Sequence, residues 1–104
     1  KSALFRWSDL RGQRAKTQKP WMEFFASDSL STGIYVLPAG SVDAQTPHKR
    51  DEVYYVVRGK ATFQVEAEQH PVDAGSVIYV EAGVDHRFHS ITEDLEVLVF
   101  FAGS

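Results

Sequence analysis

The feature that most constrains the fold is a series of short apolar runs separated by turns rich in glycine and proline. The clearest run covers residues 61–67, in which Ala61, Phe63, Val65 and Ala67 alternate with polar residues. Alternation with a period of two predicts a β-strand that has one buried and one wet face. We see no helical period of useful length. The pattern therefore predicts an all-β chain, with roughly eight strands in a sandwich or barrel.

The expected strands are rich in aromatic and β-branched residues, and they cover residues 21–26, 30–37, 53–57, 61–67, 76–80, 86–91 and 95–101. Turns are expected at 58–60, where Arg-Gly-Lys is a hairpin signal, and at 71–75 and 92–94. Residues 53–57 are apolar at every position, which predicts a strand covered on both faces. One cover would be the barrel interior, and the other a second subunit or the N-terminal arm.

The chain is expected to form one domain, because 104 residues with 43% hydrophobic content suffice for a single packed core. Residues 1–20 are mixed and polar, and we interpret them as an N-terminal arm in which Ser8 or Asp9 can cap a short turn. Residues 21–104 are expected to form a single β-barrel domain.

The composition excludes several classes of function. A net charge of -3, with scattered Lys and Arg, argues against a nucleic-acid partner. The sequence contains no apolar run of about 18 residues, so no membrane span is expected. The chain has no cysteine, which leaves His, Glu, Asp and Gln as metal ligands. The cytoplasm is the expected location.

The side chains that can carry chemistry concentrate in the segment 40–59. It contains Gln45, His48 and Glu52 just before and at the start of an expected strand, and His86 opens a later strand. These side chains are expected to converge at one mouth of a barrel. Two imidazoles and one carboxylate form the ligand set of non-haem iron sites, and Gln45 would add a neutral fourth ligand. Nitrogen and oxygen ligands suit Fe, Mn, Ni, Cu or Zn.

The same segment resembles the first motif of the cupins, which contains a glycine, two histidines, a glutamate and a second glycine. Gly40, His48, Glu52 and Gly59 fall in register with that motif. Thr46 stands where the first histidine would be. The resemblance therefore implies a metal site that lacks one of its usual imidazoles.

A second cupin motif follows after a short spacer. Gly75, Gly83 and His86 match it, whereas Glu81 replaces a proline and Ser90 replaces an asparagine. The two motifs together imply the double-stranded β-helix, or jelly-roll barrel, of the cupins. The expected strands suit the same fold.

Cupins usually hold a metal with three histidines and one glutamate, so the resemblance implies a divalent metal at His48, Glu52 and His86. Whether Gln45 turns inward past Thr46 to complete the site is left open. The implied function is a metal-dependent enzyme of dioxygenase, isomerase or lyase type that acts on a small organic metabolite. The alternatives are a cupin that binds or senses a small molecule without turnover, and a metal-free structural dimer.

Two aromatic residues are further candidates, because Tyr54 and Phe88 share strand parity with the proposed ligands and should line the cavity. The opposite face of strand 53–57 would be apolar and outward. Apolar strands exposed in this way tend to be covered by a partner, which predicts a homodimer. The residues of that outward face are Val53, Tyr55 and Val57.

Overall fold

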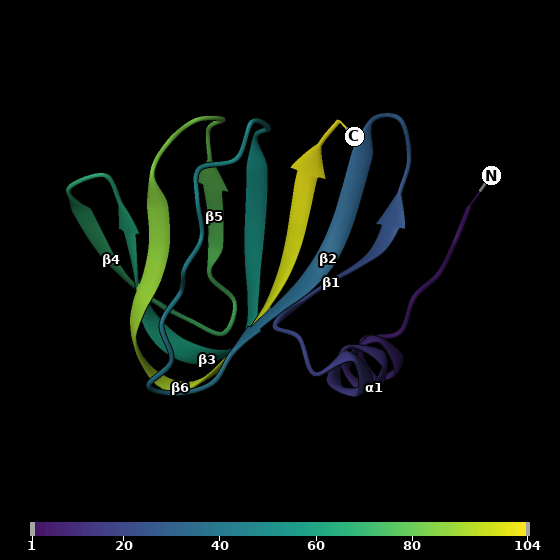
Figure 1. Cartoon of the computed structure of the whole chain (residues 1–104), viewed down its shortest axis with the longest axis horizontal. Helices are drawn as coiled ribbons and strands as arrows, with labels where there is room; N and C mark the ends of the chain where they lie inside the picture. The colour runs from purple at the N-terminus through teal and green to yellow at the C-terminus, as the bar shows by residue number, and fades with distance from the viewer. Residues whose placement is uncertain (1, 104) are drawn as a thin grey trace.

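The computed structural model describes residues 2–103 and confirms an all-β fold. In chain order the elements are α1 (Trp7–Thr17), β1 (Trp21–Ala26), β2 (Leu30–Leu37), β3 (Glu52–Val65), β4 (Glu68–Asp73), β5 (Val77–Val80) and β6 (His86–Ala102). The strands lie in the order β1-β2-β6-β3-β4, β5 pairs with β3, and neighbouring strands are antiparallel. The sheet curls into a barrel that is rounded around β3, β4 and the first half of β6 (Figure 1).

The two long strands β3 and β6 pair along their whole length and bend together. Their register runs from Glu52 opposite Phe101 to Val65 opposite His86, with irregularities on both sides of Gly59. Gly59 has φ +104°, and a Cβ there would overlap the backbone carbonyl of Asp94. Because only glycine fits this close approach, Gly59 sets the place where the sheet curls.

The expected hairpin at 58–60 is wrong, because the chain continues through these residues as a single strand. The irregularities act as β-bulges, which bend a strand and shift its alternation. Before the bend Tyr54 and Val56 are buried, whereas after it Ala61 and Phe63 are buried. The inward side chains thus change from even to odd numbers, and one bent strand resembles two separate strands in the sequence.

The turns expected at 92–94 and 71–75 are also corrected. Residues 92–94 lie within β6, and only residues 74 and 75 of the second segment form a turn. Pro71 lies in β4, opposite Thr62. Since β4 is an edge strand, the missing proline N–H removes no bond to a further strand. The six strands account for all the expected ranges, because β3 and β6 each cover two of them, whereas β4 was not predicted as a strand.

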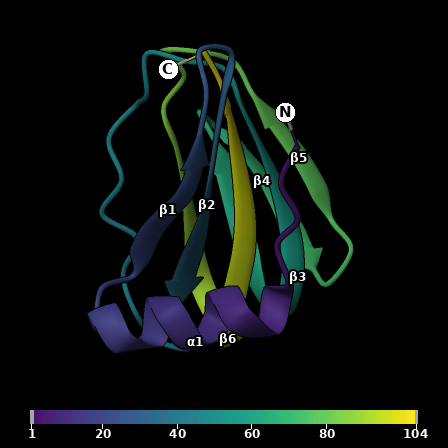
Figure 2. The ribbon, with the colours of Figure 1, turned by 90° about the vertical axis from the view of Figure 1, so that its right-hand side faces the viewer.

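The N-terminal arm contains a helix, where only a short turn was expected. Among its residues only Leu10 is buried, so α1 lacks the apolar stripe by which helices are recognised in sequences. The Arg11 guanidinium instead donates to both carboxylate oxygens of Glu96 on β6, at 2.6 and 3.0 Å. Figure 2 shows α1 lying across the lower end of the barrel, where it packs against β1 and β2.

β1 begins at Trp21, and the division into an arm and a barrel domain stays a prediction. Residue 1 of the expected arm and residue 104 of the expected barrel lie outside the described residues. Within residues 2–103, α1 is the one helix, and it is neither long nor apolar enough to cross a membrane.

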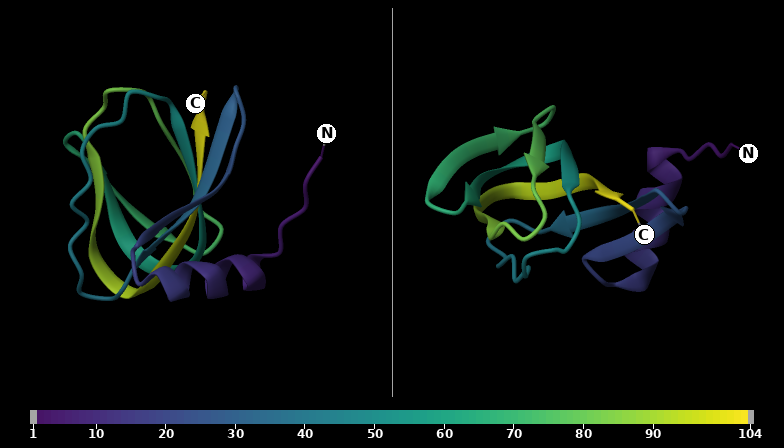
Figure 3. Two further views of the ribbon diagram at one scale, coloured as in Figure 1. Left: turned by 45° about the vertical axis from the view of Figure 1, so that its right-hand side comes forward. Right: turned by 90° about the horizontal axis from the view of Figure 1, so that it is seen from above.

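The hydrophobic core fills the interior of the curl, whereas one outer face stays uncovered. Figure 3 shows β3 and β6 curving around that interior. On the outside Tyr55, Val77 and Tyr79 are 41%, 69% and 61% exposed. Strand 53–57 was expected to be covered on both faces, but residues 2–103 cover only its inner face fully. The core residues are Leu37, Tyr54, Val56, Ala61, Phe63, Val72, Val80, Phe88, Ile91, Leu95, Val97, Val99 and Phe101.

Candidate metal centre

The bend in β3 and β6 brings a buried carboxylate and a buried imidazole together. Glu52 begins β3, whereas His86 pairs with Val65 at the opposite end of the same strand. Nevertheless Glu52 Oε1 lies 2.7 Å from His86 Nε2, and each side chain is only 1% exposed. The contact exists because the two ends of β3 face each other across the barrel interior.

His48 joins this pair from the loop between β2 and β3. One ligand atom from each of His48, Glu52 and His86 lies within 4.8 Å of the others. The His48 ring is 5.7 Å from the His86 ring and packs edge-on against Phe101 at 4.9 Å. Metal bonds to imidazole nitrogen and carboxylate oxygen measure about 2 Å, so small side-chain rotations would let one ion reach all three groups.

The hydrogen bonds of His86 show which of its two ring nitrogens carries a proton and which one faces the cluster. Nδ1 lies 2.9 Å from the carbonyl oxygen of Val84, and because a carbonyl only accepts, Nδ1 must donate. In neutral His86, Nε2 then turns a lone pair toward the Glu52 carboxylate. Apart from this contact, both Glu52 oxygens are buried and have no hydrogen-bond partner among residues 2–103. Two such groups this close together need a cation, either a proton or a metal ion.

The pKa of His86 reflects the same need for a positive charge beside Glu52. Burial lowers the pKa of His86, but the hydrogen bond to Glu52, the backbone bond to Val84 and the charges of Glu52 and Asp43 outweigh it. The pKa of His86 therefore lies above its ordinary value of 6.5 when no metal competes with the proton. A divalent ion would supply the same positive charge and also satisfy Glu52.

Gln45 turns toward the cluster, whereas Thr46 is exposed. The Gln45 amide nitrogen donates to Asp43 at 2.7 Å, which leaves its oxygen facing the site. That oxygen accepts a hydrogen bond from the Tyr54 hydroxyl at 2.9 Å and lies 3.4 Å from His48 Nε2. The fold thus brings together all four ligands proposed from the sequence, with Gln45 as the outermost.

Asp43 is a residue that the sequence analysis missed. It is 4% exposed, and its carboxylate accepts hydrogen bonds from the Tyr35 hydroxyl at 2.6 Å and the Phe88 backbone N–H at 2.8 Å, besides the Gln45 amide. These donors satisfy its charge, so Asp43 orients Gln45 rather than competing for a metal. In the sequence Asp43 stands out only by its position two residues before Gln45. That position was not enough to select it, because local sequence does not reveal that a carboxylate is buried.

The two aromatic cavity candidates differ in position. The Tyr54 hydroxyl lies 3.0 Å from His86 Nε2, inside the ligand cluster. Burial and the nearby charge of Glu52 raise the pKa of Tyr54 far above the usual value, which keeps the hydroxyl protonated without a metal. Phe88 instead packs beneath, with its ring 5.2 Å from Tyr54 and 4.8 Å from Phe63. Phe88 therefore supports the wall of the site and does not line the pocket.

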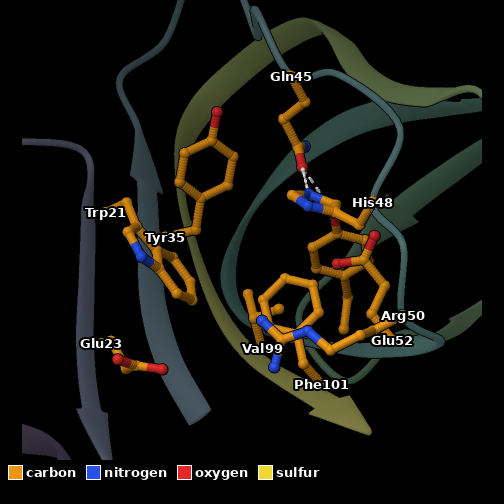
Figure 4. A pocket seen from close by; sticks show the side chains of 10 residues that line it. Trp21, Glu23, Tyr35, Gln45, His48, Arg50, Glu52, Val99 and Phe101 are labelled. Atoms are coloured by element: carbon orange, nitrogen blue, oxygen red, sulfur yellow. Dashed lines mark hydrogen bonds between the residues drawn. The ribbon is translucent and has the colours of Figure 1, made fainter. Parts of the chain in front are cut away.

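A pocket of about 320 Å³ opens onto the cluster, within the range of small-molecule sites. His48 and Glu52 line this pocket and His86 does not, so a ligand would meet His48 and Glu52 first. Trp21, Tyr35 and Arg50 were not predicted to line this pocket, because they come from separate strands and a loop. The lining residues, most of which Figure 4 labels, are Trp21, Glu23, Tyr35, Gln45, His48, Arg50, Glu52, Tyr54, Val99 and Phe101.

Residues 33–101 match the family model of the cupin domain. The chain belongs to the cupin family. The two motifs interpreted from the sequence lie within this match, which confirms the resemblance. Cupins commonly bind a divalent metal ion, and the cluster of His48, Glu52 and His86 is a candidate site for one in this cupin.

Two curated proteins are similar to this cupin. An uncharacterized protein of Streptomyces coelicolor is 47% identical over 98 residues, which cover 94% of this chain and 93% of that protein. Dimethylsulfoniopropionate lyase DddQ of Ruegeria pomeroyi is 29% identical over 82 residues, covering 76% of this chain but only 40% of the lyase. This cupin thus spans less than half the length of the lyase.

Solved structures confirm the fold. KdgF from Halomonas sp. superposes with a TM-score of 0.73 at 20% identity, over 81% of this chain and 77% of that chain. An RmlC-like cupin from Methanocaldococcus jannaschii with a double-stranded β-helix fold gives a TM-score of 0.72 at 20% identity, over 80% and 78% of the two chains. At such identities the likeness shows the double-stranded β-helix fold alone.

Proposed function

We propose that this cupin is a metal-dependent enzyme that acts on a small organic molecule. The observation that carries the proposal is the buried Glu52 carboxylate, which lies 2.7 Å from His86 Nε2 and has no other hydrogen-bond partner among residues 2–103. Buried carboxylates are ordinarily paired or coordinate a metal. His48, Glu52 and His86 would hold the ion, and the Gln45 oxygen would be the fourth ligand. The candidate metals remain Fe, Mn, Ni, Cu and Zn.

The residues around the cluster suit this role. A divalent ion there would polarise a substrate oxygen or lower the pKa of a bound water. The Val84 carbonyl fixes the orientation of His86, and Asp43 fixes that of Gln45. Val99 and Phe101 give the pocket an apolar wall that limits the access of water. A small substrate would enter from the side of His48 and place an oxygen at the ion.

The metal site is tested by titrating chelator-treated protein with Mn(II), Ni(II) and Zn(II) in a calorimeter. We expect wild type to bind one ion per chain. In His86→Ala the metal affinity should be weaker by about tenfold or more, because the substitution removes a ligand that is also the partner of Glu52. His89→Ala is the matched control, since His89 lies on the same strand but bonds Gln69 at 2.6 Å. Equal affinity in wild type and His86→Ala would contradict the site.

The role of Gln45 is tested in the same titration with two neighbouring substitutions. Gln45→Ala should weaken metal affinity about tenfold, because it removes an oxygen that faces His48 and also frees Asp43. Thr46→Ala should leave the affinity unchanged, since Thr46 is exposed. If the effects of the two substitutions were reversed, Thr46 rather than Gln45 would replace the missing histidine.

The reaction class is tested with metal-loaded protein and product analysis. Lyase, isomerase and dioxygenase chemistry are all compatible with the proposed ligand set. The partial similarity to a dimethylsulfoniopropionate lyase makes that compound the first substrate to assay. Oxygen consumption with Fe(II)-loaded protein would assign the dioxygenase class instead. Saturable binding without any product would favour the alternative, a cupin that binds or senses its ligand.

We further expect a homodimer and a cytoplasmic location, both of which stay predictions. The dimer is supported by the uncovered outer face around Tyr55, which continues onto β5 through Val77 and Tyr79. An apolar face of this kind on a sheet is ordinarily buried against a partner.

A further inference from the structure

Arg50 is the positively charged side chain of the pocket, and its guanidinium is held without a carboxylate partner among residues 2–103. Its Nη1 donates to the Ser31 hydroxyl at 3.0 Å and to the Gly103 carbonyl at 3.2 Å. The guanidinium carbon also lies 4.7 Å from the centre of the Phe101 ring, in a cation–π contact. A half-buried guanidinium that is fixed in this way is pre-organised.

The hydrogen bonds of Arg50 leave one particular edge of the guanidinium available. The two acceptors, Ser31 and Gly103, use both hydrogens of Nη1. The hydrogens of Nε and Nη2 have no partner among the described residues, and together they form a fork that matches the two oxygens of a carboxylate. In Figure 4 the side chain runs beside Phe101 from the side of Glu52 toward that of Glu23 and Trp21.

The same aromatic ring connects Arg50 to the metal cluster. Phe101 contacts the His48 ring at 4.9 Å and the Arg50 guanidinium at 4.7 Å, measured to its ring centre. A molecule small enough for the pocket could therefore place one group at the cluster and another at Arg50. Trp21, Val99 and Phe101 would contact the apolar body between these groups.

We propose that Arg50 binds the carboxylate of the substrate, so that this cupin acts on small carboxylic acids that carry a second oxygen for the metal. The inference that the substrate carries a second oxygen for the metal rests on the proposed metal-dependent function. Anion binding by Arg50 does not rest on it. Glu23 also borders the pocket and would repel an anion, but its side chain is exposed, where water screens its charge. Glu52 would be neutralised by the ion.

The test compares carboxylates with their uncharged amides, using lactate with lactamide, malonate with malonamide and benzoate with benzamide. Dissociation constants are measured by ligand-observed NMR on the metal-free and the Zn(II)-loaded chain. We expect wild type to bind at least one acid about tenfold more tightly than its amide. Arg50→Gln should reduce this ratio to near one, and Arg50→Lys should retain part of it, because lysine keeps the charge without the fork.

Arg87→Gln is the matched control, because it removes the same charge from an exposed position on β6 and should leave the ratio unchanged. Arg50→Lys carries the test if Arg50→Gln does not fold. The inference would be overturned if wild type bound every acid only as tightly as its amide, or bound none of these compounds. It would also be overturned if both Arg50 variants kept the wild-type ratio of the two affinities. Failure of Zn(II) to bind would instead overturn the proposed function, and the metal-free comparison would still decide the role of Arg50.

Discussion

At the scale of single residues, the chemistry of the site depends on the two nitrogens of His86. Nδ1 is committed to the Val84 carbonyl, which directs Nε2 at Glu52 whether a proton or a metal ion lies there. The same cluster would therefore hold a proton in the metal-free protein and exchange it for the metal ion that we propose. Metal binding must displace the proton from His86 and is expected to weaken as the pH falls.

Because the pKa of His86 is raised, the stability of the metal-free protein should depend on pH. The pKa is raised on folding, so protonation of His86 stabilises the protein fully below its unfolded value of about 6.5. That contribution is lost as the pH rises through the higher folded pKa. The free energy of unfolding in urea should therefore decrease across this interval, and Glu52→Gln should lower the pKa of His86 in an NMR titration.

The matched control for that titration is Glu68→Gln, which alters an exposed pair in which Glu68 lies 3.5 Å from His70. Water screens that pair, so the substitution should leave His86 unaffected. A pKa of His86 at or below 6.5 in metal-free wild type would show that Glu52 does not hold a proton there.

At the scale of secondary-structure elements, the bend of β3 and β6 decides whether the ligands meet. Gly59→Ala should destabilise the protein by about 2 kcal/mol or more, because its φ of +104° is strained for alanine and a Cβ would overlap the Asp94 carbonyl. Gly12→Ala is the control: Gly12 lies in α1 with no atom near its Cβ position, so alanine should stabilise the protein by about 0.5–1 kcal/mol. Urea unfolding of both variants measures the difference, and a neutral Gly59→Ala would contradict the role of the bend.

The elements also show where sequence reasoning failed. A glycine between two apolar runs is compatible with a hairpin turn and with a bulge inside one strand, and the choice depends on the approach of Asp94, 35 residues further along the chain. Helix α1 was missed for a related reason. One buried residue, Leu10, and the ion pair between Arg11 and Glu96 attach α1 to the sheet, and neither leaves a periodic apolar pattern.

At the scale of the whole molecule, the uncovered face on β3 and β5 predicts self-association. We expect sedimentation equilibrium to show a dimer at micromolar concentration and Val77→Glu to convert it into a monomer, because a buried charge without a partner is strongly unfavourable. Val42→Glu is the control, since Val42 is comparably exposed but lies in the loop before β3. A monomeric wild type would contradict the expected homodimer.

The sequence by itself determined the fold class and the family, because strand alternation and the two cupin motifs depend only on residue order. It also named Gln45, His48, Glu52 and His86 as ligand candidates. Only the tertiary structure decided that Gln45 rather than Thr46 faces the cluster, because that orientation depends on Asp43, which is buried by distant strands. The positions of Arg50 and Trp21 at one pocket likewise depend on tertiary contacts, because both side chains lie against the Phe101 ring of β6. Such long-range packing brings residues into contact without leaving a local pattern, and it assembles the site from both ends of a bent strand.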